Sequence, residues 1–387
     1  MLNFETKRTM KKDSYLNPFP ITNYLGPDYF CDRKEETARL ISYFTNGSST
    51  TLIALRRIGK TGLIHHVFSQ LPDGWKGIYV DILETENLNQ FLNVLATSII
   101  RAIPEKGSLG DRLWELLKQL RSTIGFDAMT GFPQITFDVK QQEVENNIDA
   151  LFQFMEHQEF KVIVAIDEFQ QILRYPERNT DAWLRSRIQK MQNVSFIFSG
   201  SQQHLMTELF FSPQRPFYHS TLLMRLDKID REVYAQFIVS MFGKYQKQIS
   251  VEVAKEMLDW TDTHTFYVQQ LCNRVFASTI DIATSDLWRR EAQILMEEQE
   301  LVLFTLRNML TGPQWNLLKA VAIEKILYQP TAKSFLARHN LGTSATVLRS
   351  LKTLLDYELI INTVDAEGRS YYCVYDVLLQ RWAETIR

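Results

Sequence analysis

A Gly-Lys-Thr triplet, Gly59 to Thr61, carries the clearest chemical signal in this chain. It follows a short apolar segment, Thr51 to Ile53, that is typical of a strand, and it precedes a largely apolar run from Leu63 that is typical of a helix. A strand, a turn and a helix in this order present backbone N–H groups and the positive end of a helix to phosphate groups. We therefore expect a site for ATP or GTP.

The turn itself supplies most of the expected contacts. Lys60 can reach the outer phosphates, and the hydroxyl of Thr61 can ligate Mg²⁺. Ala54 stands where the full phosphate-loop pattern has glycine, which is compatible with the turn if the backbone φ of Ala54 is negative. The expected nucleotide contacts are Ala54, Arg56, Arg57, Ile58, Gly59, Lys60, Thr61 and Gly62.

A second segment ends in two adjacent carboxylates. Residues 161–166 are largely apolar and β-branched, as in a strand buried on both faces, and Asp167 and Glu168 follow directly. Removing carboxylates from water is costly unless a cation or a hydrogen-bond donor compensates. We expect Asp167 to hold Mg²⁺ through its water shell and Glu168 to activate the attacking water. The alternative is a strand that simply emerges into solvent.

A third segment, Val194 to Phe198, predicts another buried strand, and Ser199, Gly200 and Ser201 follow it. In a parallel sheet the C-terminal ends of the strands lie at one edge, where ligands bind. Ser199 or Ser201 could sense the γ-phosphate there. The alternative is an ordinary polar strand end.

Arginines from a neighbouring subunit or domain would complete such a site by contacting the γ-phosphate. Arg215 and Arg225 follow the third strand and are candidates for this arginine finger, as are Arg56 and Arg57 in the turn. For each of them the alternative is a solvated surface residue.

The composition is that of an ordinary globular protein. A chain of 387 residues exceeds what one core usually supports, so two or three units are expected. A net charge of −2 argues against a surface coated with basic residues for constitutive nucleic-acid binding. The spacing of Cys31, Cys272 and Cys373 matches no metal site and predicts reduced thiols in a cytosolic protein. The polar residues 1–14 do not resemble a secretory signal, and no apolar segment reaches the length of a membrane span.

Strands alternate with helices through the first half of the chain, which predicts an α/β fold with a parallel sheet covered by helices on both faces. Helices are expected at 31–44, 88–103 and 146–158, with a further strand at 77–81. Residues 104–145 are less regular, with one strand at 134–137, and we treat them as an insertion. The expected domains are a lead-in at 1–25, a nucleotide-binding domain at 26–230 that contains the insertion, a helical lid at 231–310 and a C-terminal domain at 311–387.

The C-terminal domain resembles a winged helix. Helices are expected at 313–325 and 331–340, and Thr343 or Ser344 can cap a third helix. Segments 359–364 and 370–375 then flank a hairpin turn at 365–368. In a winged helix that reads DNA, the third helix enters the major groove.

Few basic residues support DNA binding by this domain. The outward candidates are Arg349 and Lys352 on the third helix and Arg369 on the wing. Between Pro313 and Arg387 nine Lys and Arg stand against seven Asp and Glu, which is a small surplus for phosphate binding. A winged helix that docks a protein, or that is purely structural, is an equal alternative.

These segments, in this order, resemble the archaeal-type ATPase family within the AAA+-like and STAND group of P-loop NTPases. The resemblance covers the chain from about residue 17 to the C-terminus. It rests on Arg-Arg-Ile-Gly-Lys-Thr at 56–61, Asp-Glu-Phe-Gln at 167–170, Ser-Gly-Ser at 199–201 and Arg-Pro-Phe-Tyr at 215–218. Two further family boxes match Phe30 to Glu35, with Asp32 where glycine is usual, and Thr263 to Tyr267, where Thr263 and Thr265 replace glycine and proline.

The resemblance implies ATP rather than GTP, nucleotide contacts from Arg33 and His264, and a helical lid over the nucleotide. We expect a cytosolic, Mg²⁺-dependent ATPase of the switch type, in which hydrolysis moves the lid and the winged helix. Its partner would be duplex DNA or a protein. Formation of an oligomer is compatible with this hypothesis, and no membrane is involved. The alternatives are a nucleotide-dependent scaffold that hydrolyses little and a small-molecule kinase, although no acceptor-binding motif is visible.

Overall fold

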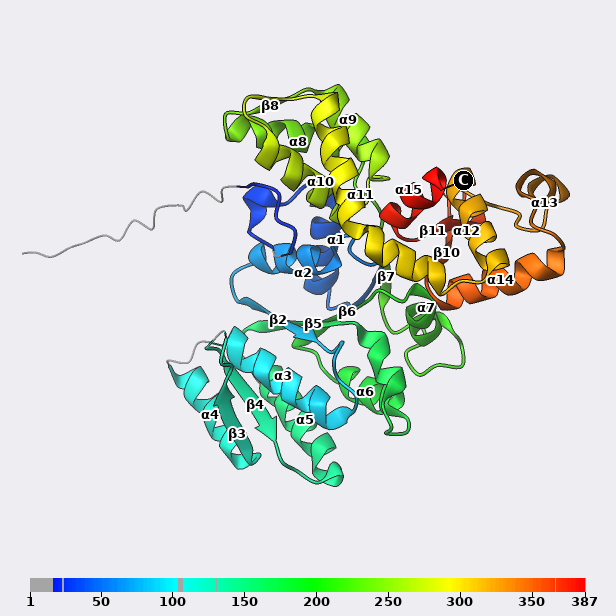
Figure 1. Cartoon of the computed structure of the whole chain (residues 1–387). Helices are drawn as coiled ribbons and strands as arrows, with labels where there is room; N and C mark the ends of the chain where they lie inside the picture. Colours follow the sequence, from blue (N-terminus) through cyan, green and yellow to red (C-terminus); the bar gives the residue numbers. More distant parts are fainter. Residues whose placement is uncertain (1–16, 23, 104–106, 130, 366, 387) are drawn as a thin grey trace, which may run out of the picture. The chain divides into compact units, whose positions relative to one another are not determined.

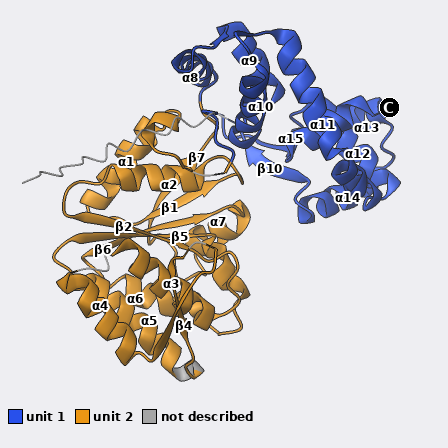
Figure 2. Cartoon of the chain, turned by 60° about the vertical axis from the view of Figure 1, so that its left-hand side comes forward, with its two compact units in different colours: residues 1–21, 230–387 blue, residues 22–229 orange. Residues whose placement is uncertain are grey.

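The chain forms two compact units (Figure 2). The computed structural model describes residues 17–22, 24–103, 107–129, 131–365 and 367–386, so most of the expected lead-in lies outside the described residues. Residues 22–229 make up one unit, which we call the sheet unit. Residues 17–21 together with 230–386 make up the other, the helical unit.

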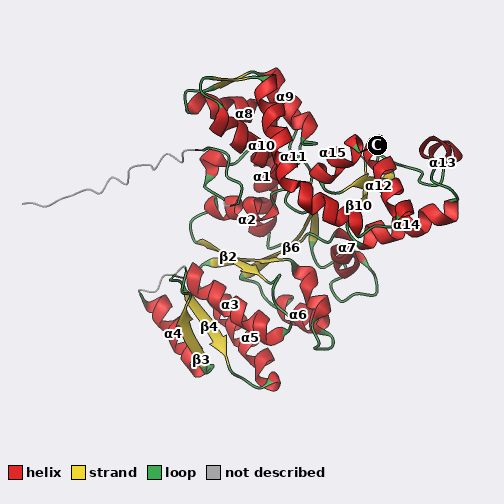
Figure 3. Ribbon diagram, in the orientation of Figure 1, coloured by secondary structure: helices red, strands yellow, loops and turns green. Residues whose placement is uncertain are grey.

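A five-stranded parallel sheet forms the centre of the sheet unit, in the order β2-β5-β6-β1-β7. Figure 3 draws strands in yellow. The strands are β1 (Thr50–Ala54), β2 (Trp75–Asp81), β5 (Lys161–Asp167), β6 (Val194–Gly200) and β7 (Leu222–Leu226). Because all five run in the same direction, their C-terminal ends share one edge. The predicted α/β fold is confirmed.

Helices cover both faces of this sheet (Figure 1). The helices α1 (Lys34–Thr45) and α2 (Lys60–Ser69) pack on one face, while α3 (Leu88–Ala102), α5 (Gln141–Glu156), α6 (Thr180–Ile188) and α7 (Gln203–Phe211) pack on the other. Successive side chains of a strand point to opposite faces. In β5, Val162 and Val164 therefore join the core under α3, whereas Ile163 and Ala165 join the core under α2.

Several parts of the sheet unit differ from the sequence prediction: α5 begins at Gln141 rather than at residue 146, and α6, α7 and β7 were not predicted. The first helix begins at Lys34 rather than Cys31, because Asp32 and Arg33 have left-handed backbones with φ of 55° and 64°. The insertion is more regular than expected: besides the predicted strand, now β4 (Pro133–Phe137), it contains α4 (Ser108–Gln119) and an antiparallel partner strand, β3 (Ser122–Phe126). The short helices η1 (Pro27–Tyr29) and η2 (Phe169–Arg174) complete the unit.

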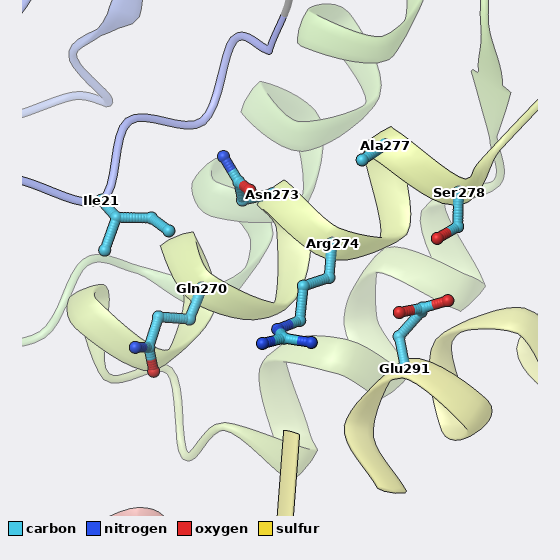
Figure 4. A pocket seen from close by; sticks show the side chains of 7 residues that line it. All are labelled: Ile21, Gln270, Asn273, Arg274, Ala277, Ser278 and Glu291. Atoms are coloured by element: carbon cyan, nitrogen blue, oxygen red, sulfur yellow. The ribbon is translucent and has the colours of Figure 1, made fainter. Parts of the chain in front are cut away.

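The helical unit begins with four helices, α8 (Arg231–Lys244), α9 (Val251–Trp260), α10 (Thr265–Ser278) and α11 (Ser285–Asn308), with the two-residue strands β8 (Gln248–Ile249) and β9 (Ile282–Ala283) between them. Residues 17–21 pack on these helices. Asn17 donates to the carbonyl of Asn273 at 2.7 Å, and the ring of Phe19 contacts Phe242 and Phe276. Ile21 then lines a cavity of about 400 Å³ beside α10 and α11 (Figure 4).

The rest of the helical unit has the helix and strand order of a winged helix. It consists of α12 (Gly312–Glu324), α13 (Lys333–His339), α14 (Ser344–Asp356), the antiparallel strands β10 (Ile360–Val364) and β11 (Ser370–Val374), and α15 (Val377–Thr385), which was not predicted. The expected cap of the third helix is confirmed, since the Thr343 hydroxyl accepts the N–H of Thr346 at 3.3 Å. Tyr267 of α10 donates to Asp376 at 2.6 Å, and Arg381 of α15 donates to the carbonyl of Trp260 at 2.9 Å.

Within the described ranges, no helix combines the length and the apolar character needed to cross a membrane. Cys31, Cys272 and Cys373, all of which are described, form no disulfide.

The packing of α2 on β2 generates a first prediction. A Cβ atom added at Gly77 would lie 2.4 Å from the Phe68 ring, so Gly77→Ala forces the ring or the strand to move. We expect the free energy of unfolding of the sheet unit to fall by about 1–3 kcal/mol. Chemical denaturation followed by fluorescence measures it. Gly125→Ala is the matched control, because the nearest atom to its added Cβ lies at 4.0 Å, and an equal loss in both variants would contradict the prediction.

Candidate nucleotide site

The phosphate-loop turn connects the last residue of β1, Ala54, to α2, which begins at Lys60. Ala54 is extended rather than left-handed, as its place in the pattern requires. Gly59 has a φ of 105°, which favours glycine, and it is followed by a helix with no side-chain cap and no acidic residue in its first turn. The first N–H groups of α2 are therefore suited to an anion.

Asp167 lies at the C-terminal end of β5 and is only 4% exposed. One carboxylate oxygen, Oδ2, accepts the hydroxyl of Thr61 at 2.9 Å and that of Tyr79 at 2.7 Å. The other, Oδ1, accepts the hydroxyl of Ser199 and the backbone N–H of Glu168 at 3.0 Å. The sheet thus brings together Thr61, Asp167 and Ser199, three of the residues that the sequence had singled out.

Glu168 follows with a left-handed backbone, φ 57°, which turns the chain away from β5. Its Oε2 atom accepts the Gln170 side-chain amide at 2.5 Å and the Ser201 hydroxyl at 2.8 Å. Arg56 in turn donates to the Ser201 hydroxyl at 3.3 Å. Gly200 allows this close arrangement, because a Cβ there would lie 2.2 Å from Oε1 of Gln170.

The sequence reasoning missed three side chains at this edge. Tyr79 contacts Asp167 directly, Asp81 lies opposite Asp167 in the register of β2 with β5, and the ring of His65 lies 4.8 Å from that of Tyr79. A signal for the first two was present, since β2 was predicted to end at Asp81 and its end had to share the edge. His65 lies one turn after Thr61 on α2.

The crowding of polar groups shifts several pKa values. Burial raises the pKa of Tyr79 well above its ordinary value, and the charge of Asp167 raises it further. Partial loss of hydration raises the pKa of Asp81, an effect that the carboxylates of Asp167 and Glu168 increase and the N–H of Leu83 opposes. Burial lowers the pKa of His65, although the Asp167 charge acts in the opposite direction.

The predicted arginines lie in separate places. Arg33 is buried and donates to Glu36 at 2.8 Å and to the carbonyl of Asp227, just after β7, at 2.7 Å. Arg215 pairs with Glu208 and, at 3.6 Å, with Asp181. Arg225 pairs with Asp227 at 2.8 Å. The predicted role of each in nucleotide binding or as an arginine finger stays a prediction.

The remaining predicted residues belong to the helical unit. His264 precedes α10 and is 5% exposed, and the centroid of its ring lies 5.0 Å from that of Tyr267. Its predicted contact with the nucleotide stays a prediction. Arg349 and Lys352 are exposed on α14. Arg369 on the wing pairs with Asp365 at 2.8 Å and Glu367 at 2.7 Å, which offsets its charge.

The residues present fit a metal bound together with a nucleotide. Thr61 and Asp167 offer two oxygen atoms 2.9 Å apart, and oxygen ligands are what Mg²⁺ prefers. No group of three or more His, Cys, Asp or Glu side chains in the described parts of the chain could hold a metal ion by itself. This agrees with the usual Mg²⁺ site, in which one or two protein groups and the phosphates share the ion.

Two family models match the chain. An ATPase domain found predominantly in Archaea matches residues 30–271, which is more than half of the chain, and a probable winged helix domain matches residues 302–385. A search of curated protein sequences returned no match.

Solved structures with low sequence identity share the fold. A Walker-type ATPase of Pyrococcus abyssi has a TM-score of 0.64 at 16% identity and covers 95% of this chain and 99% of its own. The ORC2 protein of Aeropyrum pernix, solved as ADPNP–ADP complexes, has a TM-score of 0.58 at 14% identity and 95% coverage of both chains. The ORC1 protein of Aeropyrum pernix, in complex with DNA, has a TM-score of 0.50 at 13% identity, covering 92% of this chain and 93% of its own.

The pKa of His65 provides a test of the geometry around Asp167. We expect His65 to titrate below its ordinary value of 6.5, and to titrate lower still in Asp167→Asn, because the carboxylate charge that favours the imidazolium is lost. NMR titration of the imidazole resonances measures both shifts. His66 is the internal control: burial also lowers its pKa, but Asp167 does not contribute, so its titration should be unchanged in the variant. An unmoved His65 would contradict the arrangement.

Proposed function

The chain belongs to the family of ATPase domains found predominantly in Archaea, and from this membership we propose that it is an ATP-driven molecular switch whose nucleotide state moves a winged helix. It is a P-loop ATPase with a C-terminal winged helix domain. The switch role, the residue roles, the metal and the partner are our proposals.

One observation carries the proposal: the Thr61 hydroxyl, from the start of α2, lies 2.9 Å from the Asp167 carboxylate at the end of β5. These are the two groups that would share a metal beside the phosphates. Mg²⁺, when bound, would neutralise charge on the β- and γ-phosphates. Lys60 and the N–H groups of the turn would hold the phosphates, and Ser199 would hold Asp167 in place.

Glu168 would orient the water that attacks the γ-phosphate in line. In the structure its carboxylate is bound to Ser201 and Gln170, so it would have to exchange these partners for the water. Arg215 or Arg225 of a neighbouring molecule would contact the γ-phosphate, which requires an oligomer and the loss of the present pairs with Glu208 or Asp227.

Adenine nucleotides are the proposed ligands. The ORC2 protein, which shares the fold, was solved with ADPNP and ADP, and this supports ATP over GTP. His264 in the helical unit would contact the nucleotide from the lid.

The output would be a movement of the helical unit. The bonds from Tyr267 to Asp376 and from Arg381 to the carbonyl of Trp260 tie the lid helices to the winged helix. A lid that responds to the nucleotide would therefore carry the winged helix with it, which supports a mechanical output over a small-molecule product.

The proposed partner of the winged helix is duplex DNA or a protein. The likeness to the ORC1 protein, which was solved with DNA, supports DNA, and Arg349 and Lys352 are exposed on the helix that would enter the groove. The paired state of Arg369 and the small basic surplus support a protein partner instead. A scaffold that binds nucleotide but hydrolyses little is the alternative function.

Two substitutions separate the switch from the scaffold. Lys60→Ala is expected to abolish ATP binding. Glu168→Gln should still bind ATP, but its rate of phosphate release should fall by about a hundredfold or more, because only the group that orients the water is changed. Calorimetry and a phosphate-release assay measure the two effects. Glu86→Gln, an exposed carboxylate of the same unit, is the control. Equal rates near background in the wild type and Glu168→Gln would favour the scaffold, and unchanged ATP binding in Lys60→Ala would contradict the site.

DNA binding can be tested through its salt dependence. If α14 contacts phosphates, the variant with both Arg349→Ala and Lys352→Ala should reduce the slope of log K against log salt by about 2, since each lost phosphate contact contributes about 0.9. Binding of labelled duplex DNA, with and without ATP, gives the slopes. Arg338→Ala is the control, because Arg338 is paired with Glu324 at 2.6 Å. No binding at low salt would support a protein partner.

A further inference from the structure

We propose that Tyr79 is a positioning residue that holds the Asp167 carboxylate in the orientation needed to bind the metal. The inference rests on the proposed function, in which Thr61 and Asp167 organise Mg²⁺ beside the phosphates. Tyr79 belongs to none of the motifs that define the site, since it comes from β2 rather than from the turn, β5 or β6.

The four donors around Asp167 divide evenly between its two oxygens. Oδ1 receives Ser199 and the N–H of Glu168, and Oδ2 receives Thr61 and Tyr79. A Thr61 hydroxyl that ligates a metal does so through an oxygen lone pair and keeps its hydrogen for Oδ2. Tyr79 is the donor on Oδ2 that does not itself ligate the metal, and a carboxylate held at both oxygens cannot rotate freely.

Tyr79 is itself fixed by its strand register, its buried neighbours in β2 and a ring contact. The register of β2 with β5 places it opposite Ala165, two residues before Asp167, so the phenol reaches the carboxylate along the edge of the sheet. Ile78 and Val80 on either side of it are buried and anchor the strand. The ring of His65, from the same helix as Thr61, packs against the Tyr79 ring with centroids 4.8 Å apart.

The hydrogen bond from the Tyr79 hydroxyl to Asp167 should therefore contribute to the site. A hydrogen bond to a charged acceptor is stronger than one between neutral groups, and a distance of 2.7 Å is typical of such a bond. Removing the hydroxyl leaves the aromatic packing intact but takes from Oδ2 one of its two donors, the one that does not itself ligate the metal. The loss should therefore affect the metal-dependent part of nucleotide binding rather than nucleotide binding as a whole.

Tyr79→Phe tests this inference in the full-length protein. We expect the Mg²⁺ concentration for half-maximal ADP binding to rise about tenfold, in keeping with the loss of a charge-assisted hydrogen bond, while ADP affinity in EDTA changes by less than about twofold. Calorimetric titration of ADP at a series of Mg²⁺ concentrations gives both quantities without relying on turnover. In the ATPase assay, the expected loss should be recovered in large part at high Mg²⁺.

Tyr175→Phe is the matched control. Tyr175 is a buried tyrosine of the same unit whose hydroxyl lies 2.5 Å from that of Thr85 rather than on Asp167. The substitution Tyr175→Phe removes the same hydroxyl group from the same unit, so a purely structural effect should appear equally in both variants. We expect similar losses of thermal stability in the two, and a change in the Mg²⁺ requirement in Tyr79→Phe alone.

The outcomes separate this inference from the proposed function. If Thr61→Ala loses the Mg²⁺ dependence and Tyr79→Phe keeps that of the wild type, the inference is wrong and the proposed site stands. The inference is also overturned if Tyr175→Phe shifts the Mg²⁺ requirement as far as Tyr79→Phe does. If ADP binding by the wild type does not respond to Mg²⁺ at all, the proposed function fails and this inference fails with it.

Discussion

The site depends on one constraint, which is that a carboxylate at the end of a strand buried on both faces must find hydrogen-bond donors within the protein. Asp167 ends β5, whose preceding residues are sealed under helices on each side, and it is almost inaccessible to water. Hydration cannot stabilise its charge, so hydrogen-bond donors from β2, α2, β6 and the next backbone N–H do so instead. The parallel sheet makes this possible because it gathers these elements at one edge.

Much of the site was predictable because its residues lie where an apolar strand gives way abruptly to small or charged residues. The turn before α2, the end of β5 and the end of β6 each show an apolar strand that stops at small or charged residues, and the structure places Thr61, Asp167 and Ser199 in contact. The predicted end of β2 was a signal for Tyr79, but its contact with Asp167 follows from the register of β2 with β5. His65 gave no such signal, and its place follows from the face of α2 that meets Tyr79.

The fold was also largely predictable, and its departures have local causes. Left-handed backbones at Asp32 and Arg33 delay α1 by three residues, which no periodicity of apolar residues reveals. In the insertion, β3 is exposed on most of its length and so lacks the apolar signal by which its partner β4, buried at alternate residues, was found. The last helix, α15, was overlooked although Asp376 caps it at the N–H of Leu379.

Residues 17–21 associate with the helical unit, whereas residues 22–229 form the sheet unit. The polypeptide therefore crosses from one unit to the other twice, near residue 22 and again near residue 229. Neither the complete helical unit nor its packing around Phe19 is encoded by one continuous stretch of the gene. Replacing the C-terminal segment alone would take away Phe242 and Phe276 and leave the Phe19 ring to pack against side chains to which it is not matched, so the two segments of the helical unit depend on each other.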